Sequence, residues 1–269
     1  MATSHPKGRT LDPRANAFYC DTLALLRQAE IPFLVGGAFA FGHYTSISRD
    51  TKDFDLFVLE RDAQRALDTL AGAGYRTELT FPHWLGKAFH GEHFVDIIFD
   101  SGNGAAPVDA HWFEHAVDGH VLGVPVKLVP PEEMLWQKSL IQERERFDGA
   151  DVAHLLRACA DHLDWNRVLR RFGEQWRVLL AHLVLFGFIY PGERTRIPSA
   201  IMRRLMARLE LELEQPSGEH RLCRGTILSR AQYLVDIDEW GYQDARVEPR
   251  GRMSEGEVDH WTAAIDSHK

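Results

Sequence analysis

One stretch, residues 33–58, restricts the folds open to this chain more than any other. It reads FLVGGAFAFGHYTSISRDTKDFDLFV. A short apolar run is followed by the glycine pair Gly36 and Gly37, a mixed apolar segment and a polar loop. A second apolar run then begins with Asp53, Phe54 and Asp55. This order predicts a strand, a glycine turn, a short helix, a loop and a second strand.

The second predicted strand carries two carboxylates at i and i+2. Because successive strand side chains point to opposite faces, Asp53 and Asp55 should project together while Phe54 turns into a core. Like charges on one face repel unless a cation lies between them, and Mg²⁺ accepts carboxylate oxygens while keeping positions for water and phosphate. The backbone N–H groups at Gly36 and Gly37 would open a helix, where an anion is favoured. Either pattern alone is common without a catalytic role; in this order they predict a phosphoryl-type transfer site.

A later apolar segment, residues 93–100, reads HFVDIIFD and predicts a central strand. Asp96 interrupts it, and a carboxylate in an apolar strand is costly unless it is paired or bound to metal. One interpretation is an aspartate capped by backbone donors or facing solvent at an edge. The other, which we favour, is a third carboxylate that completes the set with Asp53 and Asp55. Asp100, at the strand end, competes for this role.

Composition excludes some classes of protein. The chain has 269 residues and a formal net charge of −8, which argues against a mainly electrostatic nucleic-acid binder but leaves room for a local basic groove. Its three cysteines, Cys20, Cys159 and Cys223, are far apart and form no C-x-x-C pair. This pattern predicts reduced thiols and a cytoplasmic location, and it argues against a zinc–cysteine site.

We expect no membrane attachment. Residues 1–13 are polar and lack the apolar core of a signal peptide. The strongest apolar run, residues 178–190, is too short to span a bilayer and contains His182, so it predicts a buried helix.

The remaining periodicity predicts an α/β (α+β) architecture with a mixed sheet flanked by helices. We expect this domain to occupy residues 1–160 and a mainly helical region to occupy residues 161–269. Helices are predicted over residues 14–29, 61–71, 130–146, 148–160, 165–190 and 198–213, strands over 75–79, 87–90 and 93–100, and a hairpin over 121–128. His111 and His115 lie at helical spacing, but with no third ligand evident they predict ordinary surface or packing histidines.

The glycine pair, short helix and D-x-D strand together resemble the signature of the DNA polymerase β-like nucleotidyltransferase superfamily, over about the first 160 residues. The resemblance implies transfer of a nucleoside monophosphate from an NTP to an acceptor, with Mg²⁺ or Mn²⁺ and release of pyrophosphate. It implies that Asp53, Asp55 and Asp96 hold metal and carry catalysis, and that Gly36 and Gly37 form the phosphate turn. The pair is Gly-Gly where many relatives have Gly-Ser, so a side-chain hydroxyl contact to the triphosphate is missing.

Residues 129–156 resemble a segment of bacterial nucleotidyltransferase-like proteins, which include the AbiEii-type toxins of toxin–antitoxin systems. That group has a Lys followed ten positions later by an Asp, and Lys138 and Asp148 match this spacing. The resemblance implies that Lys138 meets the NTP phosphates; the alternative is a solvated helix face with Asp148 as a helix N-cap. Arg49, beside the D-x-D, either contacts the nucleotide or belongs to a charged surface loop, as do Thr51 and Lys52.

The expected function is therefore a nucleotidyltransferase whose acceptor is RNA, a protein or a small molecule, because the motif concerns only the NTP. The resemblance adds a role in a toxin–antitoxin system, with an antitoxin partner. The alternative is a non-catalytic member that binds a nucleotide or a partner protein on the same fold.

Overall fold

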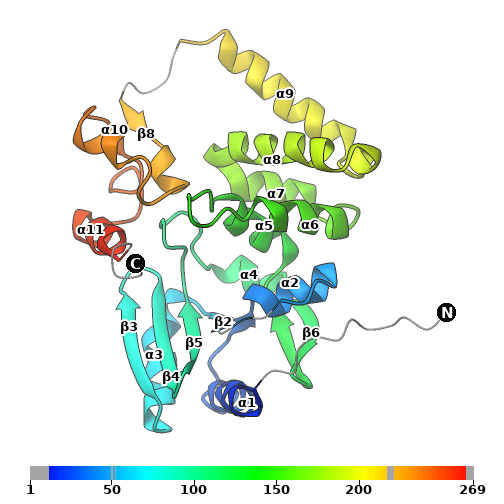
Figure 1. Cartoon of the computed structure of the whole chain (residues 1–269). Helices are drawn as coiled ribbons and strands as arrows, with labels where there is room; N and C mark the ends of the chain where they lie inside the picture. The colour runs from blue at the N-terminus through cyan, green and yellow to red at the C-terminus, as the bar shows by residue number, and fades with distance from the viewer. Residues whose placement is uncertain (1–11, 50, 52, 217–220, 265–269) are drawn as a thin grey trace, which may run out of the picture. The chain divides into compact units, whose positions relative to one another are not determined.

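The structure is a computed structural model that describes residues 12–49, 51, 53–216 and 221–264 (Figure 1). The chain forms two compact units. The first comprises Met1–Gly102 and Pro107–Pro130, and the second Asn103–Ala106 and Pro131–Lys269. These units divide at Pro130 and Pro131, whereas the composition predicted a boundary after residue 160; a functional domain that extends to residue 160 stays a prediction. Lys52 and residues 1–11 of the predicted polar lead (residues 1–13) lie outside the described ranges, while Asp12 and Pro13 of that lead belong to the start of the first helix.

The first unit is built on a mixed sheet, as predicted. Its strands are β1 (Leu34–Val35), β2 (Asp53–Phe57), β3 (Arg76–Phe81), β4 (Leu85–His90), β5 (His93–Ile98), β6 (Val117–Val121) and β7 (Val124–Leu128). They lie in the order β3-β4-β5-β2-β1-β7-β6. The pairs β2–β5 and β1–β7 are parallel and the others antiparallel. The predicted hairpin is β6–β7, although it begins four residues earlier than expected.

The register between β2 and β5 decides which side chains share a face. Asp55 lies beside Asp96, and Phe54 lies beside Val95. Phe54 is fully buried and stacks on Tyr19 with ring centroids 4.8 Å apart. The predicted alternation is therefore confirmed: Phe54 enters the core, and the aspartates occupy the opposite face.

Four helices complete the first unit. They are α1 (Pro13–Gln28), α2 (Gly37–Thr45), α3 (Glu60–Gly72) and α4 (Ala110–Glu114). α1 starts with proline in its first turn and the side chain of Asp12 as N-cap, which suits a helix N-terminus. α3 buries Ala66, Leu67 and Leu70 against the sheet, and Gly86 of β4 leaves the space that Leu67 fills.

The second unit is mainly helical, as predicted for its larger part. Its helices are α5 (Pro131–Ser139), α6 (Gly149–Cys159), α7 (Trp165–Phe172), α8 (Trp176–Ile189), α9 (Ser199–Leu213), α10 (Leu234–Asp238) and α11 (Glu255–Ala263). Two short strands, β8 (Leu222–Cys223) and β9 (Gln243–Asp244), pair in parallel. Within this unit α5, α6, α7 and α8 pack on one another, and α9 packs on α8 (Figure 1).

The helix predicted over residues 130–146 is too long by seven residues. α5 ends at Ser139. The chain then folds back on itself, because Gln142 bridges Phe147 and the N–H of Glu143 donates to the carbonyl of Arg146 at 2.9 Å. This tight turn satisfies the backbone groups that a continued helix would otherwise pair, so the helix can end early. Apolar periodicity does not indicate such a turn, and it therefore did not locate the helix end.

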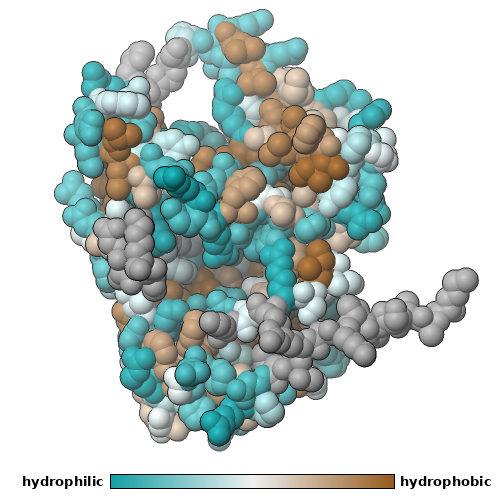
Figure 2. Space-filling model, in the orientation of Figure 1, coloured by the Kyte–Doolittle hydropathy of each residue, from teal (hydrophilic) through white to brown (hydrophobic). Residues whose placement is uncertain are grey.

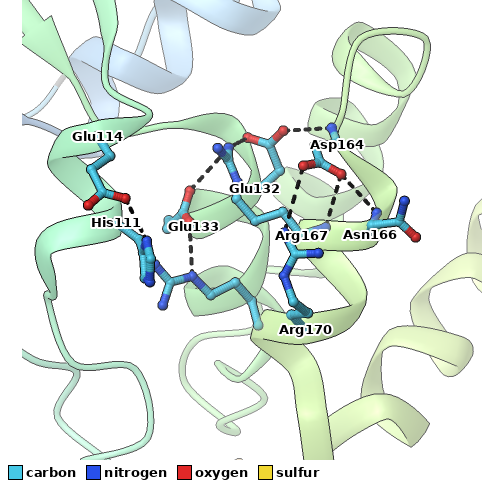
Figure 3. Close-up of polar contacts among 9 residues, drawn as sticks. His111, Glu114, Glu132, Glu133, Asp164, Asn166, Arg167 and Arg170 are labelled. Carbon is cyan, nitrogen blue, oxygen red and sulfur yellow. Dashed lines mark hydrogen bonds and ion pairs between the residues drawn. The ribbon is translucent and has the colours of Figure 1, made fainter.

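α5 begins with Glu132 and Glu133 in its first turn, where the helix dipole favours acidic residues. Glu132 is 4% exposed and Glu133 is fully buried. Arg167 of α7 donates to Glu132 and lies 3.5 Å from Glu133, while Nε of Arg171 donates to Glu133 at 3.0 Å (Figure 3). Burial raises the pKa of Glu133, and the two arginines oppose that rise. The buried carboxylates are tolerated because each has a guanidinium partner.

The predicted buried helix over residues 178–190 is exposed on one side. α7, a 3₁₀ turn and α8 form one helical stretch, Trp165–Ile189, with the length and composition of a membrane span and 39% of its most apolar window buried. Val184, Leu185, Phe188 and Ile189 are exposed, and Figure 2 shows apolar side chains over α8 and α9. The apolar run of residues 178–190 is short by itself, but the helical stretch that contains it meets the length of a span. One such helix is weak evidence for a membrane span, since core helices pass the same test.

The buried ion pairs generate a prediction for stability. Arg167→Met should lower the free energy of unfolding by about 3–5 kcal/mol, because it leaves the buried carboxylate of Glu132 without its guanidinium partner. Arg170→Met, on the same helix, is the matched control. Arg170 is 68% exposed and lies 3.9 Å from Asp164 (Figure 3), so its loss should cost less than about 1 kcal/mol. Urea unfolding of both variants measures the difference, and equal losses would contradict the assignment.

Candidate active site

Three carboxylates gather on the sheet of the first unit. Asp53, Asp55 and Asp96 each offer an oxygen, and these oxygens lie within 4.8 Å of one another. The cluster follows from the register, because β2 and β5 run parallel with Asp55 beside Asp96. Asp96 is 8% exposed, while the other two are half-buried. The competitor Asp100 instead accepts the backbone N–H of Ser101 at 2.7 Å.

The glycine pair has a packing role that the sequence did not reveal. The N–H of Gly36 donates to the carbonyl of Asp55 at 3.0 Å, so it belongs to the β1–β2 pairing. Gly37 has φ +52°, and a Cβ there would lie 1.6 Å from Oδ2 of Asp55. Gly37 therefore lets this carboxylate approach the first turn of α2, whose N–H groups have no intrahelical acceptor. The predicted phosphate contact would use that turn, since the N–H of Gly36 is already engaged.

Thr51 and Arg49 belong to the loop that precedes β2. The hydroxyl of Thr51 donates to the carboxylate of Asp53 and also to its carbonyl, at 3.2 Å for the latter. Thr51 therefore holds the first aspartate in place. The guanidinium of Arg49 lies 4.6 Å from the ring centroid of Phe41 in α2, a cation–π geometry. Its predicted nucleotide contact stays a prediction.

Lys87 is the closest partner of Asp96, and the sequence analysis missed it. Its Nζ lies 2.6 Å from Oδ1 of Asp96 and 4.2 Å from the ring centroid of Phe94. Burial raises the pKa of Asp96, Lys87 lowers it, and the neighbouring charge of Asp53 raises it again. The signal was present in the β4–β5 hairpin: counting back from the pair His90 and His93 places Lys87 opposite Asp96.

Tyr19 of α1 is a second residue that the sequence analysis missed. It is 1% exposed. Burial, followed by the charges of Asp53, Asp55 and Asp96, raises its pKa to about 12. Its hydroxyl therefore stays protonated at neutral pH, as a neutral hydrogen-bonding group under the influence of the three carboxylates.

Lys138 lies in the second unit, between two aspartates. Its Nζ is 2.8 Å from Oδ2 of Asp148 and 2.7 Å from Oδ2 of Asp151, and Nε of Arg146 is 3.0 Å from Oδ1 of Asp148. Asp148 precedes α6 but makes no side-chain capping bond. Burial alone would raise the pKa of Asp148, but Arg146 and Lys138 hold it below its usual value. The structure thus pairs Lys138 with Asp148, while the nucleotide contact of Lys138 stays a prediction.

Comparison with known proteins identifies relatives. Residues 21–186 match the model of a family described as uncharacterised nucleotidyltransferase. The comparison with curated proteins gives no match. Similar solved structures include the antibiotic-resistance factor ANT(2'')-Ia, with 17% identity, a TM-score of 0.43 and coverage of 64% of this chain and 98% of that one. A lincosamide antibiotic adenylyltransferase, LnuA, has 16% identity, a TM-score of 0.38 and coverage of 55% and 98%. An antigenic nucleotidyltransferase-like protein from Paracoccidioides brasiliensis has 16% identity, a TM-score of 0.47 and coverage of 72% and 99%.

The close approach of Gly37 to Asp55 predicts a specific sensitivity. Gly37→Ala adds a Cβ both at positive φ, at a cost of about 1–2 kcal/mol, and against a carboxylate, at about 1–3 kcal/mol more. Gly123→Ala is the control, because Gly123 has φ +78° but nothing within 4 Å of its Cβ position. Denaturant unfolding should show the larger loss for Gly37→Ala. A loss no greater than that of the control would show that Asp55 moves aside freely.

Proposed function

We propose a reaction for this chain, which belongs to the family described as uncharacterised nucleotidyltransferase. The chain transfers a nucleoside monophosphate from an NTP to an acceptor in the presence of Mg²⁺ or Mn²⁺. Pyrophosphate is the second product. The observation that carries the proposal is the convergence of Asp53, Asp55 and Asp96 within 4.8 Å of one another on adjacent strands. The glycine turn and the start of α2 lie against the same cluster.

The residues fit a hard divalent cation. All three donors are carboxylates, the oxygen ligands that Mg²⁺ prefers, and Asp53, Asp55 and Asp96 would hold it. Three negative charges at this separation, one of them largely buried, are unfavourable without positive charge between them. Lys87 supplies only one such charge. When bound, the metal supplies Lewis-acid stabilisation of the phosphate oxygens and lowers the pKa of an acceptor hydroxyl.

The proposed reaction is a displacement at the α-phosphorus. The acceptor oxygen forms the new bond to phosphorus, the bond to the bridging oxygen breaks, and pyrophosphate leaves with the electron pair. The acceptor proton goes to a base, for which Asp96 is one candidate; in the other arrangement Asp96 only holds the metal. The first turn of α2 favours negative phosphate through its N–H groups and dipole. Arg49 and Lys138 are the proposed secondary contacts.

The acceptor remains RNA, a protein or a small molecule. Lys138 and Asp148 keep the spacing found in the AbiEii-type group, and they form an ion pair here. On that spacing alone we retain a role in a toxin–antitoxin system, with an antitoxin partner, as part of the proposal. The cysteine pattern adds a cytoplasmic location to it.

One observation favours a second candidate function, a non-catalytic module that binds a nucleotide or a partner. Asp96 already has a cation beside it, because Nζ of Lys87 lies 2.6 Å away. In a binding module, Lys87 would permanently occupy the charge position that a metal takes in an enzyme. The two predictions below separate these functions.

Purified protein incubated with each α-³²P-NTP, Mg²⁺ or Mn²⁺ and cell extract should transfer label to RNA, protein or a small molecule. Asp53→Asn and Asp55→Asn should each reduce the rate by about 100–1,000-fold, since a metal contributes several kcal/mol to transition-state stabilisation. Asp100→Asn, which alters a buried carboxylate outside the cluster, is the matched control and should stay within a few-fold of wild type. Label transfer that survives in both site variants would refute the assignment, and NTP binding without transfer would support the binding module.

Lys87→Met should lower the stability of the metal-free protein by about 3 kcal/mol, because Asp96 loses its partner in a largely buried position. Lys127→Met is the control, since Lys127 forms a similar cross-strand pair with Asp118 at 2.7 Å, but that pair is exposed. Its loss should cost less than about 1 kcal/mol. Saturating Mn²⁺ should recover most of the loss in Lys87→Met if the cluster binds metal. A loss that Mn²⁺ leaves unchanged would favour the non-catalytic function.

A further inference from the structure

A second cluster of metal-binding side chains lies on α4. The sequence around it reads Asp109, Ala110, His111, Trp112, Phe113, Glu114, His115. His111 and His115 are separated by four positions and Glu114 lies three after His111, so a helical turn brings all three to one side. In the sequence the two histidines lacked a third ligand. The structure adds a third candidate ligand by placing the carboxylate of Glu114 with them.

The ligand atoms converge. One nitrogen from each histidine and one oxygen of Glu114 all lie within 4.8 Å of one another. Nδ1 of His111 lies 2.7 Å from Oε2 of Glu114. Figure 3 draws this contact as a dashed line. The rings of His111 and His115 are 6.5 Å apart and nearly parallel, at 23°. A small ion placed among the three side chains would replace the hydrogen bond between His111 and Glu114. Because the ligand atoms are already close, the helix backbone would not need to move far.

The short helix that carries these side chains is fixed at several points. Trp112 is fully buried and stacks on Phe57 with ring centroids 5.4 Å apart. Asp109 caps the N-terminus by accepting the N–H of His111 at 3.0 Å, and the N–H of His115 donates to the carbonyl of His111 at 3.2 Å. The buried tryptophan therefore holds the turn on the unit, while the two histidines and Glu114 are exposed.

We propose that His111, Glu114 and His115 form a binding site for a divalent transition metal, with Zn²⁺ as the reference ion. Two imidazoles and a carboxylate are a donor set that zinc favours, and a fourth position stays open to water or another ligand. The three-carboxylate cluster on the sheet has the opposite preference, for hard cations. The order His-x-x-Glu-His also occurs in a class of zinc peptidases, in whose motifs the two histidines bind zinc and the glutamate acts as a base. Here the three side chains are exposed, so we assign metal binding and not hydrolysis.

The test is zinc binding to the full chain, free of any affinity tag and stripped with a chelator. Calorimetry in excess Mg²⁺, which occupies carboxylate sites, should detect one zinc that is weakened at least about tenfold in His111→Ala and in His115→Ala. His120→Ala is the matched control, because His120 is an exposed histidine on β6 of the same unit. Circular dichroism confirms that each variant is folded, which the exposure of these side chains favours.

An Asp53→Asn/Asp55→Asn double variant separates the two clusters. It should keep the zinc affinity of wild type. The proposal is overturned if zinc does not bind, if it binds equally well to His111→Ala/His115→Ala, or if the aspartate variant alone loses it. Because the experiment measures metal binding, an absence of transferase activity would leave the zinc result intact. Likewise, an absence of zinc binding would leave the proposed transferase function intact.

Discussion

The parallel pairing of β2 with β5 determines the rest of the candidate site. It places Asp55 directly beside Asp96 and puts both on the face opposite Phe54. A shift of one residue in either strand would turn one carboxylate into the core. The pairing therefore depends on a well-packed opposite face, which Phe54, Tyr19 and Val95 supply. The same register therefore places apolar side chains in the core on one face of the sheet and the charged cluster on the other face.

Much of this arrangement could be read from the sequence, because it depends on local rules. Alternation along a strand located Asp53 and Asp55 on one face, and an aspartate in an apolar strand identified Asp96. The sequence predicted a turn at the glycine pair, but it did not show why glycine is needed at Gly37. The need for Gly37 arises from the carboxylate of Asp55, eighteen positions later, which only the folded chain brings against it.

The features that were missed depend on contacts between elements. Glu132 and Glu133 lie in a first helical turn, and the sequence does not show that their partner arginines come from α7. The significance of Lys87 depends on the strand pairing that places it beside Asp96. Glu114 becomes a third candidate ligand only when the helical turn brings it beside His111 and His115. The end of α5 was also not predicted. The helix stops at Ser139 because the chain folds back, and hydrophobic periodicity does not indicate such a turn.

The ion pair between Lys87 and Asp96 fixes the electrical balance of the cluster. Three carboxylates and one ammonium group together leave two negative charges, which is the charge that one divalent cation cancels. A second cation would then give the cluster a net positive charge unless it arrived with an anion of its own. By this charge balance, the proposed site would take one divalent metal by itself, and it would take further positive charge only together with a polyanion such as a triphosphate.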